Sequence, residues 1–457
     1  GKTSVVRALL ASEKLKADGV LLLAPTGKAT VRLAQKAGQN ALNLAQFLYR
    51  LKRYDGFRQR VRFDGEIRRD ERTVIVDECS MLTEDHLVAL LKALDLGHVQ
   101  RLILVGDPNQ LPPIGVGRPF ADLVAHLADN GATALARLTV ELRTTATAKP
   151  SDILRLASLY TDQTPRVDAD AVLAELAANA GSRDATSAGA GGADSDVRLV
   201  FWRTASELRD ALLTEIALAL GMEGPRDIKG FNAALGLTGQ GLVPFSDHSG
   251  AERVQILSPV RMQAWGTYDL NRFLQGVFRA DEIQRSRKPG GLSYGPEEIV
   301  LRDKVMLVRN GTYDAWDWAS RSKIKDYLAN GEVGLVARVQ APWFNVAFAH
   351  REHLHVSFRK VPATADSVDL ELAYALTVHK AQGSEFEIVF VVVPAEGSLL
   401  SRELLYTAIT RARRRLVLLV QGDNVAVLRE LSRPEKSETA RRSTKLFNVG
   451  ARLDATV

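Results

Sequence analysis

Two adjacent carboxylates, Asp77 and Glu78, follow a short apolar run over residues 73–76. A run of Thr, Val and Ile is typical of a buried strand, and a parallel strand covered on both faces is apolar at every position. Open α/β sheets bind their ligands where the strands end. Carboxylates at such an end favour a magnesium–nucleotide site, with Asp77 holding the metal, usually through water, and Glu78 polarising the attacking water. The simpler alternative is a strand that ends in solvated acids.

A phosphate-binding sequence opens the chain. Gly1-Lys2-Thr3 is the second half of the loop G-x-x-x-x-G-K-[ST], and residues 4–15 have helical periodicity. Lys2 would reach the terminal phosphates, Thr3 would ligate magnesium, and the helix N-terminus would favour the anion. The first half of the loop and the strand before it are not in the printed sequence. We therefore expect these 457 residues alone to bind ATP weakly, and roughly 10 or more upstream residues to restore binding and hydrolysis.

Two further predicted strands also end in polar turns. Residues 20–24 lead into Pro-Thr-Gly-Lys-Ala and a helix, which is most simply a strand, a turn and a capping threonine. Alternatively, Thr26 and Lys28 hold the phosphate backbone of a nucleic acid. Residues 101–105 lead into a proline-rich loop, where the amide of Gln110 could sense a γ-phosphate because it both donates and accepts hydrogen bonds.

Residues 50–72 carry nine Lys or Arg against five Asp or Glu, with Tyr54, Phe57 and Phe63 interleaved. Two Asp-Gly pairs in this segment are turn signals and predict a small basic hairpin. A charge run is usually a solvated face. Aromatic residues among arginines also suit a nucleic-acid surface, so both interpretations stay open.

The second half of the sequence again alternates apolar strands with helices. Strands are expected over residues 254–259, 303–309, 388–393 and 416–420, and residues 331–339, 344–348 and 353–358 predict a small antiparallel barrel. Residues 181–196 contain mainly Gly, Ala, Ser and Asp, which predicts a flexible loop. The polar and basic end of the chain is expected to be weakly ordered.

Composition narrows the class of protein. A length of 457 residues favours two or more domains, and 46% hydrophobic residues suffice for large cores. The net charge of +6 is compatible with a polyanionic partner. A single cysteine, Cys79, excludes an intramolecular disulfide and a cysteine-rich zinc cluster, and it favours a reducing, cytoplasmic setting. We find no apolar run of about 18 residues and expect neither a membrane span nor a secretory signal.

Seven motifs, taken together and in order, resemble those of the RecD-like branch of superfamily 1 helicases. They are GKT, APTGKA, DECSM, GDPNQLPP, LTVELRT, ALTVHKAQGSEF and LLYTAITRARRR. Each motif is weak alone, but seven in this order leave little room for chance. GDPNQLPP and TVHKAQGSEF favour the RecD-like branch over UvrD-like relatives. The resemblance extends from Gly1, inside the first motif, to about Gly422.

The resemblance implies an α/β fold with two RecA-like P-loop domains, each with a parallel sheet, and ATP with Mg²⁺ in the cleft between them. Gly1, Lys2 and Thr3 would bind phosphates, with Thr3 and Asp77 also at the metal. Glu78 would activate water, Gln110 would contact the γ-phosphate, and Asp107, Gly383 and Glu385 would lie at the nucleotide. Arg143 and Arg411 resemble arginine fingers. Pro25, Thr26, Lys28, Thr377 and His379 match positions that contact single-stranded DNA.

The same resemblance divides the chain. Residues 1–137 would form the first domain, with a pin-like hairpin at about 50–70. Residues 138–430 would form the second, with a disordered loop at 181–196 and an SH3-like β-barrel insertion at about 331–360. Residues 431–457 would be a weakly ordered basic tail.

Simpler structural roles exist for several of these residues. Arg411 lies in an arginine-rich run that could be a basic surface, and its place after YTAIT is what selects it. His379 could be a structural histidine, and Cys79 most simply fills a small buried space.

The predicted function is an ATP-dependent helicase that moves along single-stranded DNA, by resemblance 5′ to 3′, and unwinds duplex DNA, with recombination or repair proteins as partners. The residues do not distinguish DNA from RNA. Two alternatives remain: a P-loop nucleotidase or kinase with another acceptor, and a truncated protein that binds nucleic acid without hydrolysis. DNA-stimulated ATP turnover separates them, because neither alternative would show it. No carboxylate cluster suggests a nuclease.

Overall fold

The computed structural model describes residues 2–56, 58, 60–138, 151–161, 168–178, 195–397 and 399–444. Gly1, Arg143, the side chain of Thr3 and most of the expected flexible segment lie outside the described residues. The chain divides into two compact units. Unit 1 comprises the described residues within Gly1–Lys149, Ser401–Glu403 and Arg433–Val457, and unit 2 those within Pro150–Leu400 and Leu404–Ser432.

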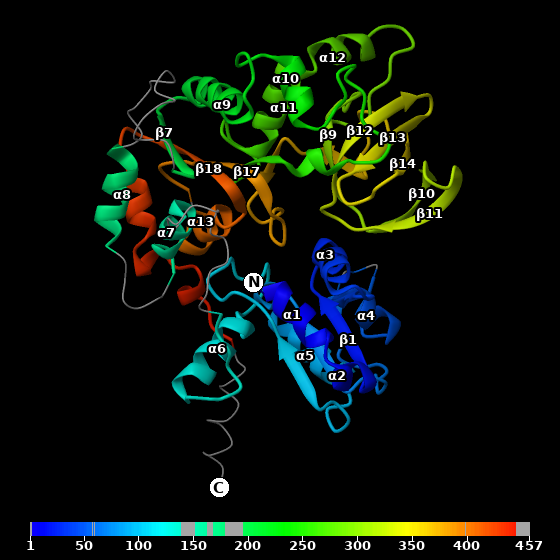
Figure 1. Cartoon of the computed structure of the whole chain (residues 1–457), viewed down its shortest axis with the longest axis vertical. Coiled ribbons are helices and arrows are strands. Elements are labelled where there is room, and N and C mark those ends of the chain that lie inside the picture. Colours follow the sequence, from blue (N-terminus) through cyan, green and yellow to red (C-terminus); the bar gives the residue numbers. More distant parts are fainter. Residues whose placement is uncertain are drawn as a thin grey trace. The chain divides into compact units, whose positions relative to one another are not determined.

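Unit 1 is built on a four-stranded parallel sheet in the order β2-β1-β5-β6. The strands are β1 (Val20–Ala24), β2 (Leu42–Asn43), β5 (Thr73–Val76) and β6 (Arg101–Leu104). The helices are α1 (Lys2–Leu10), α2 (Glu13–Ala17), α3 (Gly27–Ala37), α4 (Leu44–Arg50), α5 (Glu84–Ala93) and α6 (Pro119–Asp129), and Figure 1 shows them around the sheet. The strands expected near residues 20, 73 and 101, and the helix after the phosphate-binding sequence, are confirmed.

Both faces of this sheet are buried, which explains why its inner strands are apolar at every position except Thr73. Leu21 and Leu23 of β1 point into a core with α4 and α5, whereas Leu22 and Ala24 point into a second core with α1 and α3. Strand β5 alternates between the two cores in the same way. Burial on both faces leaves the strand ends as the places where polar groups can be solvated or bind ligands.

The basic segment contains a two-stranded antiparallel hairpin, β3 (Tyr54–Asp55) with β4 (Arg60–Val61). Arg53, one of its nine basic residues, is a structural cross-link rather than a surface charge. Its guanidinium donates hydrogen bonds to the carbonyls of Phe63, Gly65 and Glu66 at 2.7–2.9 Å. Gly65 has a φ of +142°, and a Cβ there would lie 2.5 Å from the Leu51 carbonyl oxygen, so this turn requires glycine.

Unit 2 contains a five-stranded parallel sheet in the order β16-β8-β17-β18-β7. The strands are β7 (Val197–Trp202), β8 (Val254–Ser258), β16 (Ala375–Thr377), β17 (Phe386–Val393) and β18 (Ala412–Gln421). The helices are α7 (Asp152–Ser158), α8 (Ala169–Ala178), α9 (Ala205–Leu220), α10 (Ile228–Ala234), α11 (Thr267–Phe278), α12 (Ala280–Ser286), α13 (Arg402–Ile409) and α14 (Ala426–Leu431). The first two residues of α13, Arg402 and Glu403, belong to unit 1. Strand β18 begins four residues before its expected start, so Arg413–Arg415 belong to the strand.

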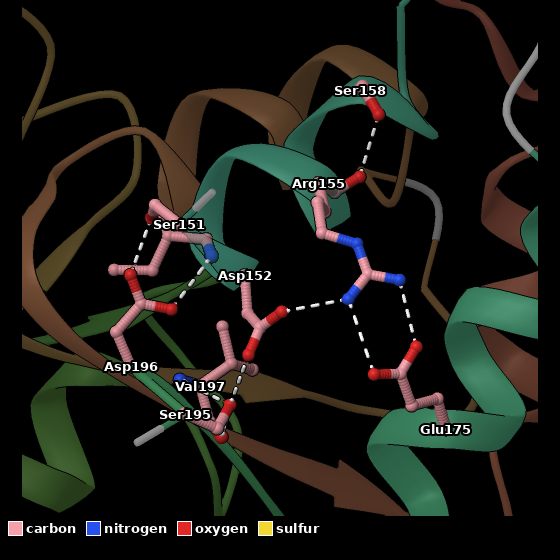
Figure 2. Close-up of polar contacts among 9 residues, drawn as sticks. Ser151, Asp152, Arg155, Ser158, Glu175, Ser195, Asp196 and Val197 are labelled. Atoms are coloured by element: carbon pink, nitrogen blue, oxygen red, sulfur yellow. Dashed lines mark hydrogen bonds and ion pairs between the residues drawn. The ribbon is translucent and has the colours of Figure 1, made fainter. Parts of the chain in front are cut away.

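Helix α7 is anchored to the start of β7 by side chains on both segments (Figure 2). The Asp196 carboxylate accepts hydrogen bonds from the Ser151 hydroxyl and the Ile153 N–H, which satisfies the first turn of α7. Arg155 joins α7 to α8 through a two-bond ion pair with Glu175. Asp196, at the end of the polar segment 181–196, therefore caps a helix distant in sequence. This role gives the acidic residue directly before edge strand β7 a structural function.

A seven-stranded antiparallel sheet, β11-β10-β14-β13-β12-β9-β15, completes unit 2. Its strands are β9 (Lys304–Leu307), β10 (Gly311–Asp317), β11 (Ser322–Leu328), β12 (Val333–Gln340), β13 (Trp343–Phe348), β14 (Leu354–Arg359) and β15 (Leu370–Leu372). Strands β9, β12, β13 and β14 were expected. The sequence analysis missed the hairpin of β10 and β11 (Figure 1), whose outward residues are charged and polar. The α/β fold with two parallel sheets and an antiparallel insertion is confirmed.

A buried polar network stabilises unit 2 around Arg279 and Asp303, both fully buried. The Arg279 guanidinium donates to the Asn232 side chain and the Arg302 carbonyl. The Asp303 carboxylate accepts from the Gln275 side chain, the Val300 N–H and the Tyr374 hydroxyl at 2.7–2.8 Å. Burial nevertheless raises the pKa of Asp303 to about 6, because the three donors and the charge of Arg279 only partly replace hydration.

Among the described residues, every helix is too short or too polar to cross a membrane.

We predict that Asp303→Asn changes the pH dependence of unit 2 stability. A raised folded-state pKa gives a stability contribution that is fully present below the unfolded-state pKa and is lost as the pH rises through about 6. The native protein should therefore lose stability on the order of 1 kcal/mol between about pH 5 and about pH 7.5, and the variant should not. All five tryptophans lie in unit 2, so denaturant unfolding followed by their fluorescence measures this unit.

The matched control is Asp314→Asn, which alters an exposed carboxylate of the same unit and should follow the native curve. The free energies of unfolding of Asp303→Asn and the native protein are compared at both pH values. If their difference is the same at both, the prediction is contradicted.

Candidate active site

Three polar segments meet where the strands of the unit 1 sheet end, because these strands are parallel and in register. We call this row of carboxyl ends the edge of the sheet. Leu23 pairs with Val76, and Val76 pairs with Leu104, so β1, β5 and β6 end side by side. The chain after β5 is bound to both neighbours: the Asp77 N–H donates to the Leu23 carbonyl and the Cys79 N–H to the Val105 carbonyl, each at 2.9 Å. The edge therefore holds the turn after β1, the paired carboxylates and the proline-rich loop.

The backbone at the carboxylate pair adopts an unusual conformation. Glu78 has φ +53° and ψ +42°, in the left-handed region that residues other than glycine rarely adopt. Such strain costs roughly 1–3 kcal/mol and concentrates at functional sites. Asp77 is 6% exposed, and its carboxylate accepts a hydrogen bond from the Glu78 N–H at 2.9 Å. The Oε2 atom of Glu78 is buried and has no hydrogen-bond partner.

Lys2 adds a positive charge to this edge from the first turn of α1. Its Nζ is buried without a hydrogen-bond partner, which is costly unless a ligand supplies one. Burial, and next the neighbouring Glu78, raise the pKa of Asp77, whereas the Glu78 N–H and the charge of Lys2 oppose this rise. A divalent cation with phosphate would stabilise both groups, because it brings positive charge to Asp77 and acceptors to Lys2.

The proline-rich loop contributes an unused acceptor to the same edge. The Gln110 side chain donates weakly to Asp107 across 3.4 Å, while its Oε1 is buried without a partner. Gly106 permits close packing here, since a Cβ would lie 2.6 Å from the Phe120 ring. The sequence analysis missed Ser80, whose buried hydroxyl is also unpartnered. Its signal was its position, two residues after Glu78 in a loop at a strand end.

The turn after β1 is a capped helix start, as the simpler interpretation expected. Thr26 is the N-cap of α3, and its hydroxyl accepts a hydrogen bond from the Ala29 N–H at 3.3 Å. Lys28 is 4% exposed, while Pro25 and Thr26 are half-buried. A contact of this turn with nucleic acid stays a prediction.

In unit 2 the predicted site residues lie at opposite ends of the parallel strands: some follow the carboxyl end of a strand, and others precede the amino end. Thr377 ends β16, and its hydroxyl accepts from the Lys380 N–H. His379 is half-buried in the turn that follows. Glu385 directly precedes β17 and forms an ion pair with Arg413 at 2.9 Å. This arrangement separates the residues expected at DNA from those expected at the nucleotide.

Arg411, which directly precedes β18, is 5% exposed. Its guanidinium donates hydrogen bonds to the carbonyls of Thr407 at 3.0 Å and Ser384 at 2.9 Å. Gly383, with φ +72°, provides the turn that brings the second of these carbonyls into place. Arg411 is thus positioned by its own unit, whereas the neighbouring Arg414 is exposed.

No group of three or more His, Cys, Asp or Glu that could hold a metal occurs among the described residues. Mg²⁺ is usually held by one or two carboxylates together with substrate phosphates. Asp77 is the described residue suited to that role, and the unpartnered atoms of Lys2, Glu78 and Gln110 fit a polyphosphate and its attacking water.

The sequence of this chain is similar to known families and proteins. The model of a family described as AAA domain matches residues 1–158, and that of the UvrD-like helicase C-terminal domain matches residues 372–419. The ATP-dependent RecD2 DNA helicase of Deinococcus radiodurans is 28% identical over 91% of this chain and 45% of its own length. RecBCD enzyme subunit RecD of Mycobacterium tuberculosis is 27% identical over 100% of this chain and 69% of its own length.

A solved structure is also similar, that of two coordinating Pif1 helicases at forked double-stranded DNA. It has 16% identity and a TM-score of 0.45, and the match covers 100% of this chain and 90% of that one. This chain spans less than half of the RecD2 helicase and about two thirds of the mycobacterial RecD. On the family matches and the relatives that cover most of its length, this chain is similar to the RecD-like helicases of superfamily 1.

Proposed function

We propose that the protein is a DNA-dependent ATPase that moves along single-stranded DNA, 5′ to 3′, and separates duplex DNA. The observation that carries the proposal is the group of buried, unpartnered polar atoms at one sheet edge: Lys2 Nζ, Glu78 Oε2 and Gln110 Oε1. Buried polar atoms without partners are rare in folded proteins, so three of them at one edge favour a ligand that satisfies them. ATP supplies acceptors for the lysine and a water that the carboxylate and amide can orient.

The residues of unit 1 divide the work of hydrolysis. Magnesium, when bound, neutralises charge that develops on the phosphates. Asp77 would hold it, Lys2 would bind the terminal phosphates, and Thr3 would complete the metal ligands, while Asp107 supports Gln110. Glu78 would take a proton from the attacking water, because its Oε2 is free of hydrogen-bond donors. Gln110 would orient this water against the γ-phosphate.

Unit 2 would supply the transition-state charge and part of the DNA contact. Arg411 is held by two carbonyls, so its guanidinium is oriented before any nucleotide binds. Arg143, which falls within Gly1–Lys149 and not within unit 2, is the second proposed finger. Gly383 and Glu385 would lie near the nucleotide. Thr377 and His379 would contact single-stranded DNA together with Pro25, Thr26 and Lys28. The 5′ to 3′ direction is inferred from the family.

The relatives' names support a role beside other proteins. One relative is named as a subunit of the RecBCD enzyme, and another as an ATP-dependent DNA helicase. We therefore propose recombination or repair proteins as partners. A cytoplasmic setting is part of the proposal and is supported by the single, buried Cys79.

The proposal predicts ATP turnover that single-stranded DNA stimulates. A phosphate-binding loop works by placing backbone N–H groups around phosphate. We call a chain that carries roughly 10 or more residues upstream of Gly1, enough for a strand and the full loop, the extended chain. Its turnover is measured with and without single-stranded DNA and should rise strongly when DNA is added. An extended chain that DNA does not stimulate would overturn the proposed function.

We predict that Glu78→Gln, in the extended chain, abolishes hydrolysis and keeps nucleotide binding. The amide preserves size but cannot accept the proton, so turnover should fall by about 10²-fold or more. The matched control, Asp85→Asn, changes an exposed carboxylate of the following helix and should leave turnover unchanged. Nucleotide affinity is measured in parallel by titration. Near-native turnover in Glu78→Gln would remove this residue from the catalytic role.

We also predict that Arg411→Ala lowers turnover much more than nucleotide affinity. Arginine fingers contribute about 10³-fold or more to the rate, because they stabilise charge present only in the transition state. Arg414→Ala, an exposed neighbour in the same run, should have little effect. Because Arg411 is buried, tryptophan fluorescence should first establish that both variants fold. Equal losses of turnover in the two variants would mean that the run is only a basic surface.

A further inference from the structure

The last described segment of the chain, residues 433–444, belongs to unit 1 and lies against the loop that carries Gln110. We call this segment the strap. It contains two short 3₁₀ turns, Pro434–Lys436 and Thr439–Arg441, in place of the weak order expected from its composition. Neither the proposed catalytic roles nor the motifs explain why it is held there.

Arg442 is the main contact of the strap with the loop. Its guanidinium donates hydrogen bonds to the carbonyls of Pro113 at 2.7 Å and Gly115 at 3.0 Å. An ion pair with Glu438, one turn earlier in the strap, orients the same guanidinium. Because a planar guanidinium that donates to two fixed acceptors defines both distance and direction, Arg442 sets the position of the loop backbone.

A second pair of contacts binds the strap to the far end of the loop. The Arg118 guanidinium donates to the Thr439 carbonyl at 2.8 Å. The Thr444 N–H donates to the Asp122 carboxylate at 3.1 Å, and Asp122 also pairs with Arg118. The loop between Gln110 and α6 is therefore bound to the strap on both sides of its exposed residues, Ile114 and Val116.

The strap is itself anchored by a buried carboxylate. Glu403 is 5% exposed, and its oxygens accept hydrogen bonds from the Ser437 hydroxyl and from the N–H groups of Glu438 and Thr439. A carboxylate buried to this degree needs such donors, because its desolvation would otherwise be costly. Glu403 stands eight residues before Arg411 in the sequence.

The strap also lines a small pocket next to the catalytic groups. Thr439 lines it together with Ser80, Pro112 and Phe120. Gln110 also lines this pocket. The loop contains three prolines, Pro108, Pro112 and Pro113, which have no N–H to bond the loop internally. Hydrogen bonds donated by the strap therefore help to fix the loop that carries Gln110.

We propose that Arg442 and Glu403 are positioning residues for ATP hydrolysis, which act by holding the Gln110 loop through the strap. The inference rests on the proposed role of Gln110 at the γ-phosphate. A residue that orients the attacking water is effective only if its side chain is fixed before the reaction. A small displacement of that side chain lowers the rate of hydrolysis more than it lowers the affinity for the nucleotide. Loss of the strap contacts should thus lower kcat and leave nucleotide affinity nearly unchanged.

The test uses Arg442→Ala in the extended chain, with Arg441→Ala as the matched control. Arg441 is exposed and donates only within the strap, to the Glu435 carbonyl. Hydrogen–deuterium exchange should show amides of residues 107–118 exchanging about 10-fold faster in Arg442→Ala than in the control. DNA-stimulated kcat should fall by about 10-fold with affinity within about twofold. Arg442→Lys should recover part of both losses, since an ammonium can donate to the loop carbonyls but lacks the second guanidinium nitrogen that pairs with Glu438.

A double-mutant cycle identifies the route of the effect. If Arg442 acts through Gln110, then Arg442→Ala should lower kcat less than about twofold once Gln110→Ala is present. An equal factor in both backgrounds, or kcat and exchange like those of Arg441→Ala, would overturn the proposal. Glu403→Gln, which weakens the anchor, should change exchange and kcat in the same direction, and normal values there would also overturn it. A native extended chain without DNA-stimulated turnover would overturn the proposed function instead, while the exchange measurement would still decide whether the strap holds the loop.

Discussion

The structure depends on one constraint: a parallel sheet buried on both faces has no place for polar side chains except at its strand ends. In unit 1 the alternating residues of β1 and β5 fill two separate cores. Asp77 and Glu78 come at the first position where the chain can leave this apolar environment. Their charges are nevertheless only partly solvated, as the raised pKa of Asp77 shows. The edge that carries the proposed catalytic residues is therefore a direct result of how the sheet is packed, and incomplete solvation there suits the proposed chemistry.

Much of this edge could be predicted from sequence because strand ends and motifs coincide. Short runs of Val, Ile and Leu located β1, β5 and β6, and parallel pairing brings their ends together. The left-handed backbone at Glu78 could not be predicted, since it accompanies a tertiary hydrogen bond from the Cys79 N–H to the carbonyl of Val105, the residue after β6. The cap formed by Thr26 was the simpler of two interpretations, and the sequence alone did not select between them. Ser80 was missed because nothing in its residue type indicates burial.

The errors elsewhere have a common cause, which is that polar sequence was equated with loose structure. The hairpin of β10 and β11 is charged on its outward face, so its alternation was not recognised as strand. The strap is polar and basic, yet buried Glu403 binds it. Arginines illustrate the same point. Arg53, Arg279 and Arg411 are each largely buried and donate to backbone carbonyls, so part of the basic excess stabilises the fold and is not available to a polyanion.

The division of the chain has a consequence for its covalent architecture. The sequence passes from one unit to the other after Lys149, Leu400, Glu403 and Ser432, so neither unit is a continuous stretch of polypeptide. A single cut of the backbone at any one of these junctions could not release either unit as a complete piece. Expression of residues 1–149 alone would yield the sheet and the catalytic edge without Glu403 and the strap. Gene fusion, truncation or domain exchange at the obvious boundary would thus divide a unit that the chain assembles from three separate segments.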